Sequence, residues 1–208
     1  MEVSSAVSYR ACGKMEFLST GGHPYMLRRS YLTKKVRVKN SPVSGKGVFA
    51  KEVINKDEII AIWAGDIISA EQLMSLSRSK FKDILDYATP VAEGFYLVTN
   101  RNGRYLEDDD YFNHSCQPNA GIKGHLIMVA MRKILPGEEV VYDYAMTDAG
   151  FNSRFRCRCG KKGCRRIITS YDWKNPALQK KYRGYFSWFV QSKIDELKRK
   201  DHKRSCKT

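Results

Sequence analysis

Several features that would assign this chain to other protein classes are missing from its sequence. No apolar run approaches the roughly 18 residues of a membrane-spanning helix, and the N-terminus lacks the basic-then-apolar pattern of a secretion signal. There is no internal repeat and no low-complexity block. With 42% hydrophobic and 12% aromatic residues, we expect a packed globular protein of the nucleus or cytoplasm, where thiols stay reduced and no membrane is contacted.

Basic charge is abundant and unevenly distributed. The 208 residues carry a net charge of +15, made up of +7 over residues 1–50, −6 over residues 51–148 and +14 over residues 149–208. An acidic middle suits a cationic peptide, and basic ends suit a polyanion such as DNA. Plain solubility explains the same charges, and for the terminal residues 198–207 a solvated tail and nucleic-acid contact are equally favoured.

The hydrophobic pattern indicates a mainly β fold with helical additions. Short strands are predicted over residues 36–38, 48–50, 58–64, 95–98, 125–131 and 140–144. A helix is predicted over residues 69–87, with Gln72 completing a capping box. Asn175 and Pro176 predict the start of an amphipathic C-terminal helix, which Gly184 interrupts or kinks.

A cysteine cluster gives the strongest chemical signal. Cys157, Cys159 and Cys164 lie within eight residues, among glycines and basic residues, and three thiolates so close suit a soft tetrahedral ion such as zinc. On spacing alone, the fourth ligand is Cys116 or His114. These two residues also allow a Cys–His nucleophile, which we favour less because no third, orienting group is evident. The remaining two cysteines, near the chain ends, are expected to be free thiols.

Four segments, in this order, resemble those of the SET-domain protein lysine methyltransferases. They are residues 45–50 (GKGVFA), 113–119 (NHSCQPN), 137–144 (GEEVVYDY) and the 157–164 cysteine cluster. The resemblance implies a SET-domain β-clip with a pseudoknot, a zinc-bound post-SET loop and a C-terminal helix. Its implied bounds are an N-terminal extension over 1–32, a SET domain over 33–148, a post-SET zinc segment over 149–168, and a C-terminal helix with a basic tail over 169–208.

The resemblance also implies a function. The methyl donor is S-adenosylmethionine, the acceptor is a lysine of a basic protein such as a histone, and the protein acts in the nucleus; bacterial cytoplasm is the alternative location. Tyr144 matches the active-site tyrosine, and Tyr142 matches the position that limits how many methyl groups fit, so monomethylation is expected. Residues two apart on a strand share a face, as a channel wall requires.

The resemblance assigns ligands to the remaining motif positions. Zinc is held by Cys116, Cys157, Cys159 and Cys164, and such a closed four-thiolate site is structural because catalytic zinc keeps an open position. The positions that match the cofactor pocket are Gly45, Lys46, Gly47, Tyr96, Asn113, His114, Tyr144, Phe155 and Arg158.

The sequence departs from the family at residues 107–110 (EDDD), where the family often has a Gly-Asn…Arg-Phe stretch. This acidic run forms a solvated loop or attracts the basic flanks of a substrate; calcium-loop spacing is absent. Two other function classes stay open. One is a non-catalytic SET-like module that binds chromatin, and the other is a zinc-stabilised nucleic-acid-binding protein, although finger-type Cys/His spacing is absent. The oligomeric state and the target lysine are left open.

Overall fold

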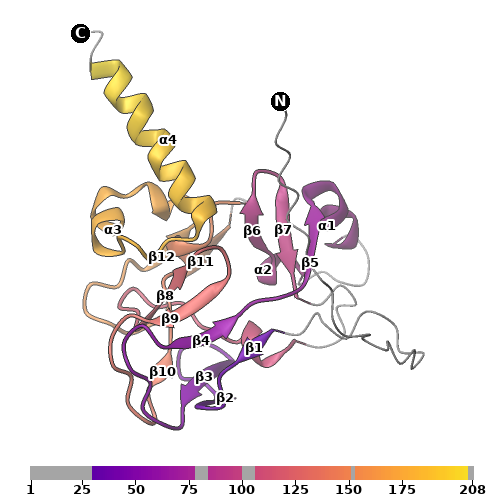
Figure 1. The fold of residues 1–208 in the computed structure, drawn as a ribbon, viewed down its shortest axis with the longest axis vertical. Helices are drawn as coiled ribbons and strands as arrows, with labels where there is room; N and C mark the ends of the chain where they lie inside the picture. Colours follow the sequence, from indigo (N-terminus) through magenta and orange to yellow (C-terminus); the bar gives the residue numbers. More distant parts are fainter. Residues whose placement is uncertain (1–29, 78–83, 100–105, 151–152, 206–208) are drawn as a thin grey trace, which may run out of the picture.

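The computed structural model describes residues 30–77, 84–99, 106–150 and 153–205, whose strands form four small antiparallel sheets (Figure 1). The largest contains, in spatial order, β1 (Tyr31–Leu32), β4 (Ile59–Ile62), β9 (Ile127–Ala130) and β8 (Ala120–Lys123). The second contains β10 (Glu139–Val140), β3 (Lys46–Ala50) and β2 (Val36–Asn40). The third contains β5 (Asp66–Ser69), β7 (Phe95–Val98) and β6 (Thr89–Ala92), and a ribbon pairs β11 (Arg154–Arg156) with β12 (Ile167–Thr169). The predicted mainly β fold with helical additions is confirmed.

Helical segments flank these sheets. They are α1 (Ala70–Ser77), α2 (Ile84–Tyr87), α3 (Pro176–Lys181) and α4 (Trp188–Ser205), with 3-10 turns η2 (Asp108–Asp110), η3 (Tyr144–Met146) and η4 (Asp172–Lys174). Figure 1 shows the β5–β7–β6 sheet with α1 on one side of the molecule and α3 on the other, while the end of α4 projects from the body. Among the described residues, none of the helices combines the length and apolarity that a membrane crossing demands.

The main core joins the central strands to the C-terminal helices. Ile60 of β4, Ile122 of β8 and Met128 of β9 are fully buried, and Val190 and Ile194 of α4 pack into the same cluster. Each such side chain contributes roughly 1.5–3 kcal/mol by leaving water. The C-terminal segment is therefore part of the fold's interior rather than an appendage.

A smaller core holds the β5–β7–β6 sheet to α1 and α2. Ser69 and Gln72 form the predicted capping box. The Ser69 hydroxyl accepts from the Gln72 backbone N–H (3.2 Å), and the Gln72 side-chain oxygen accepts from the Ser69 backbone N–H (2.9 Å). Leu73 and Ile84 are buried in one cluster, as the predicted apolar face requires. The predicted helix over residues 69–87 is described as two pieces, because residues 78–83 lie outside the described part of the chain.

The C-terminal helix begins as predicted but does not continue as one helix. The Asn175 side chain accepts a hydrogen bond from the Ala177 backbone (2.9 Å), with Pro176 in the first turn. Gly184 has a φ of +82°, in the left-handed region that glycine adopts freely. The interruption there is complete, since α3 ends at Lys181 and a second helix, α4, follows.

The predicted strand over residues 140–144 is shorter than expected. It ends at Val140, and Tyr142 forms an isolated parallel bridge with His114. The Asp143 side chain then accepts from the Ala145 backbone (3.1 Å) and caps η3. The bridge brings together residues 113–119 and 141–144, the segments of two motifs that are distant in the sequence, and so builds the site.

Candidate functional site

A cavity of about 760 Å³ gathers most of the predicted cofactor residues, and its size is typical of a small-molecule site. Its main walls come from residues 43–46, 85–90, 109–114 and 155–158. The predicted residues that line it are Gly45, Lys46, Tyr96, Asn113, His114, Tyr142, Tyr144, Phe155 and Arg158. Gly47 is not among the lining residues. Segments from four parts of the chain thus converge on one space.

Aromatic rings form one side of this cavity. The ring centroid of Tyr144 lies 5.0 Å from that of Tyr142, 5.2 Å from His114 and 5.8 Å from Phe155. The Tyr142 ring in turn lies 5.9 Å from Trp63. Aromatic faces attract cations through their quadrupole. The cavity wall therefore suits an organic cation that cannot lose its charge, such as a sulfonium group.

The two tyrosine hydroxyls are neutral hydrogen-bonding groups. The Tyr144 hydroxyl donates to the Phe112 carbonyl oxygen (3.1 Å), and the Tyr142 oxygen accepts from the Thr147 hydroxyl (3.4 Å). Desolvation raises the pKa of both phenols well above the usual value for tyrosine. Both hydroxyls therefore keep their protons at physiological pH and can orient a reactant, but they do not act as bases.

The Asn113 side chain holds the glycine-containing loop in place. Its amide nitrogen lies within hydrogen-bond distance of two loop carbonyl oxygens (2.9 and 3.2 Å) and of Glu139 Oε1 (2.8 Å). Gly45 has a φ of +46°, which explains a glycine there. A Cβ at Gly47 would overlap the Glu139 carboxylate. Close packing on Glu139 is therefore a reason for this glycine that the sequence did not reveal.

His114 is buried and neutral. Desolvation lowers its pKa to about 4, although Asp143 nearby acts in the opposite direction. Its Nδ1 accepts from the Tyr144 backbone N–H (3.2 Å), so by this hydrogen bond the ring proton lies on Nε2, 3.5 Å from Cys116 Sγ. His114 is thus placed to donate toward the sulfur, and it cannot at the same time take a proton from it. This geometry does not support the Cys–His nucleophile.

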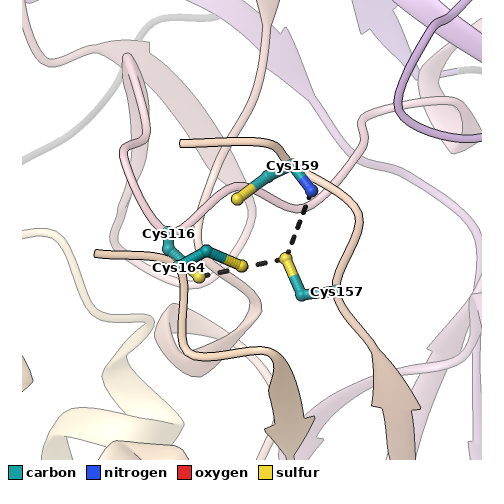
Figure 2. A group of neighbouring side chains, drawn as sticks. All are labelled: Cys116, Cys157, Cys159 and Cys164. Carbon is teal, nitrogen blue, oxygen red and sulfur yellow. Dashed lines mark hydrogen bonds between the residues drawn. The ribbon is translucent and has the colours of Figure 1, made fainter. Parts of the chain in front are cut away.

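The four predicted metal ligands meet in one cluster. The sulfurs of Cys116, Cys157, Cys159 and Cys164 lie within 4.8 Å of one another and face a common space (Figure 2). The Cys116–Cys157 sulfur distance is 3.9 Å, and tetrahedral zinc with bonds of about 2.3 Å requires sulfurs about 3.8 Å apart. The donor set therefore fits zinc, and it is complete without His114.

The surroundings of the sulfurs favour thiolates once a cation is present. The backbone N–H of Arg165 donates to Cys116 Sγ and that of Arg166 to Cys164 Sγ, both at 3.4 Å. Desolvation raises the pKa of Cys116 to about 11. At Cys159 desolvation also raises the pKa, but backbone hydrogen bonds outweigh it and lower the value to about 6. A divalent cation would allow all four thiols to ionise together.

The acidic run is partly turned inward. Residues 108–110 form η2, and Asp109 and Asp110 line the cavity. Asp110 accepts from the Thr99 hydroxyl (2.8 Å), and desolvation raises the pKa of Asp110 to about 6. The expectation of a solvated loop is therefore wrong for two of the four acids, because the turn directs them toward the cavity.

Sequence reasoning missed a set of buried polar residues behind the site. Asp143 lies between the two site tyrosines and pairs with Arg165 and Tyr182. The signals were the presence of an acid between the two site tyrosines and of an arginine directly after the last cysteine of the cluster. Neither signal identifies the partner, since the contacts span 22 and 39 residues.

Comparisons with known proteins agree with this geometry. Residues 45–145 match the model of the SET domain family. The chain is 30% identical over 159 residues to human histone-lysine N-methyltransferase 2B, and 28% identical over 142 residues to histone-lysine N-methyltransferase ASHR3 of Arabidopsis thaliana. These alignments cover 70% and 63% of this chain, but only 6% and 27% of the relatives.

Among solved structures, ctPRC2 in an autoinhibited conformation bound to S-adenosylmethionine aligns with a TM-score of 0.46 at 23% identity, over 54% of this chain and 15% of that chain. The family match covers the glycine loop, the Asn113–His114 segment and both site tyrosines. Residues 45–145 of this chain are therefore a SET domain.

Proposed function

We propose that this chain is an S-adenosylmethionine-dependent protein-lysine N-methyltransferase. One observation carries the proposal: eight of the nine predicted cofactor residues line a single cavity, together with Tyr142. The SET domain match and the histone-lysine methyltransferase names of the relatives support the same reaction. A non-catalytic module would have no need of two neighbouring tyrosines in the cavity, one buried and one half-buried, at the position of the family's active site.

The reaction places clear demands on the protein. S-adenosylmethionine supplies a sulfonium methyl group. The bond between the methyl carbon and the sulfonium sulfur breaks as a bond between that carbon and the lysine nitrogen forms. The lysine must lose its proton first, and its ordinary pKa is about 10.4. Desolvation by Trp63, Tyr142 and Tyr144 disfavours the ammonium form. Alignment of the two reactants by the cavity walls then supplies much of the acceleration.

The test is direct. The full chain is incubated with radiolabelled S-adenosylmethionine and a panel of histones, nucleosomes and lysate proteins, and the modified lysine is mapped by mass spectrometry. Transfer to a histone lysine supports the proposal and a nuclear site of action. Binding of S-adenosylmethionine by calorimetry, with no transfer to any member of the panel, would favour the non-catalytic module instead.

Tyr142 is expected to limit the product to monomethyl-lysine. Its hydroxyl is held by Thr147 and occupies space beside Tyr144 that a methylated amine would need. In Tyr142→Phe, di- and trimethyl products should rise at least about tenfold, since one lost hydrogen bond of about 1.4 kcal/mol corresponds to that factor. Mass spectrometry of the products measures this, with exposed Tyr171→Phe as the matched control. Efficient trimethylation by the wild type would show that Tyr142 has no such role.

We propose further that zinc occupies the four-cysteine cluster in a structural role. A closed set of four thiolates leaves no open position for a reactant. The ion would instead fix the end of β11 and the loop that follows it, where Phe155 of the strand and Arg158 of the loop line the cavity on either side of Cys157. Zinc in this position would hold the outer wall of the cofactor pocket.

The loop around the cluster is also the best-supported nucleic-acid contact. Six exposed cations, none ion-paired within the described part of the chain, lie on it or on the adjoining strand β11: Arg154, Arg156, Arg158, Lys161, Lys162 and Arg166. Such a concentration fits the phosphates of nucleosomal DNA. Residues 1–29 of the basic N-terminal part lie outside the described residues, so the loop and α4 carry this part of the proposal.

Neutralising two of these cations should lower the salt dependence of DNA binding. For the Lys161→Gln/Lys162→Gln variant, the slope of log K against log salt should become shallower by about 1.8, since each lost phosphate contact changes it by about 0.9. Fluorescence anisotropy with a labelled duplex measures the slope. The pair Lys56→Gln/Lys133→Gln, exposed and outside the loop, is the control. Equal slopes for the two double variants would exclude this loop as the DNA-binding surface.

A further inference from the structure

Asp143 lies at the centre of a buried polar network directly behind the cavity. It is fully buried and stands between Tyr142 and Tyr144 in the chain. Its carboxylate oxygens accept from Arg165 Nη1 (2.6 Å) and Nη2 (2.8 Å), and from the Tyr182 hydroxyl (2.8 Å). A two-pronged arginine–carboxylate pair fixes direction as well as distance. The backbone between the two tyrosines is therefore held from behind by side chains of two other segments.

Arg165 connects this network to the cysteine cluster. Its backbone N–H donates to Cys116 Sγ (3.4 Å), while its guanidinium reaches Asp143. Its Nε also donates to Asp172 (2.9 Å), which the Thr169 hydroxyl contacts in turn (2.8 Å). One residue thus joins the predicted metal site, the segment with the site tyrosines and η4.

The end of α3 reaches the same point. Tyr182 is fully buried, and its hydroxyl lies 2.8 Å from Asp143 Oδ2 and 3.3 Å from the Cys116 carbonyl oxygen. Lys181 Nζ donates to that carbonyl at 2.8 Å. Through the neighbouring residues Lys181 and Tyr182, the C-terminal segment therefore contacts both the cysteine cluster and the segment with the site tyrosines.

We propose that Arg165 and Tyr182 are positioning residues, which hold Asp143 and thereby set the placement of Tyr142 and Tyr144 in the cavity. Net stability does not explain such a pair well, because burial of all of Asp143 and most of the Arg165 side chain costs hydration that offsets much of their attraction. Positioning explains the pair better, since displacement of a reacting group by about 1 Å lowers a reaction rate by about 10²-fold. The expected effect on kcat rests on the proposed methyl transfer. The expected effect on where Tyr142 and Tyr144 lie does not depend on that reaction.

Arg165→Lys tests the proposal with the charge retained. Lysine cannot make the two-pronged contact, so kcat should fall about 10–100-fold. The KM for S-adenosylmethionine should stay within about twofold, and the zinc content and melting temperature near those of wild type. Arg132→Lys is the matched control, because Arg132 also pairs with an acid, Glu138 (2.7 Å), but on the surface. It should leave kcat unchanged.

A second variant covers the case in which Arg165→Lys does not fold. Tyr182→Phe keeps the buried ring and removes only one donor to Asp143. Its kcat should fall about 3–10-fold, a smaller loss than for the arginine because Tyr182 supplies one hydrogen bond to the carboxylate and Arg165 supplies two. Tyr185→Phe, on the same turn and without a hydroxyl hydrogen bond among the described residues, is its control and should retain full activity.

A spectroscopic measurement separates this inference from the proposed function. In protein labelled with 3-fluorotyrosine, the fluorine resonances of Tyr142 and Tyr144 are assigned by single Tyr→Phe variants. Both should shift or broaden in Arg165→Lys and in Tyr182→Phe, but not in the two controls. Unchanged resonances, or a fall in kcat that follows loss of zinc, would overturn the proposal. If the wild type transfers no methyl group, the proposed function fails and these spectra still decide the positioning role.

Discussion

Tyr144→Phe will remove nearly all methyl transfer and leave the fold intact. The Tyr144 hydroxyl is a neutral donor whose oxygen lies 3.1 Å from the Phe112 carbonyl oxygen, in a wall shared with His114 and Phe155. A preoriented hydrogen-bonding group at a reacting centre contributes about 10²–10³-fold to kcat. The lost hydrogen bond itself changes the free energy of unfolding by only about 1 kcal/mol. A large effect on rate is therefore expected with a small effect on stability.

Single-turnover kinetics with radiolabelled S-adenosylmethionine measure this rate, and circular dichroism and calorimetry check the fold and cofactor binding. Tyr171→Phe, which removes a hydroxyl from a residue that is 53% exposed, is the control. If Tyr144→Phe retains more than about a tenth of wild-type kcat, a hundredfold role is excluded and another group must orient the reactants.

Cys157→Ser is expected to cause the largest loss of stability. The four sulfurs lie within 4.8 Å of one another, and the 3.9 Å between Cys116 and Cys157 is close to the spacing that zinc requires. Zinc present at about a thousandfold its Kd stabilises a folded protein by about 4 kcal/mol. In a chain of this size, that loss lowers the melting temperature by about 8–16 °C. Binding of S-adenosylmethionine should weaken as well, because Phe155 and Arg158 line the cavity on either side of Cys157, which would hold the ion.

The zinc content of the wild type and Cys157→Ser is measured by elemental mass spectrometry, and the melting temperature by differential scanning calorimetry. Cys206→Ser, a change at a cysteine outside the cluster and outside the described residues, is the matched control. A chelator should reproduce the destabilisation in the wild type but not lower the Cys157→Ser value further. Equal melting temperatures for wild type and Cys157→Ser would exclude a stabilising metal at this cluster.

Short-range signals in the sequence predicted the structure well. The Ser69–Gln72 capping box and the Asn175 cap depend on groups two or three residues apart, so their hydrogen bonds are specified locally. The cysteine cluster was also local for three of its four members. Only Cys116 is distant, 41 residues from its nearest partner in the sequence, and the family resemblance rather than spacing identified it.

What the sequence did not predict depends on distant contacts. The strand over residues 140–144 was expected to continue, but Asp143 caps a turn there and pairs with Arg165. The assignment of Gly47 to the cofactor stays a prediction, and the structure adds its close packing on Glu139. In each case the periodic pattern is correct about burial, but it carries no information on which distant residue is the partner.

The proposed boundaries of the extension, the SET domain, the zinc segment and the C-terminal part stay predictions. The family match over residues 45–145 lies inside the predicted 33–148. The main core continues well beyond that match, since Tyr182 and Val190 are fully buried in it. A shortened chain limited to the matched residues would expose that core to water.

The contact between Tyr182 and Asp143 has a consequence for the order in which the protein is made. During synthesis, every residue of the four family motifs leaves the ribosome before α3 does. The nascent chain then contains Tyr142 and Tyr144, but Asp143 still lacks a donor that comes later. Contacts this distant in sequence form slowly. The site is therefore completed only after the segment with Tyr182 has been made and has docked, which would delay activity until then.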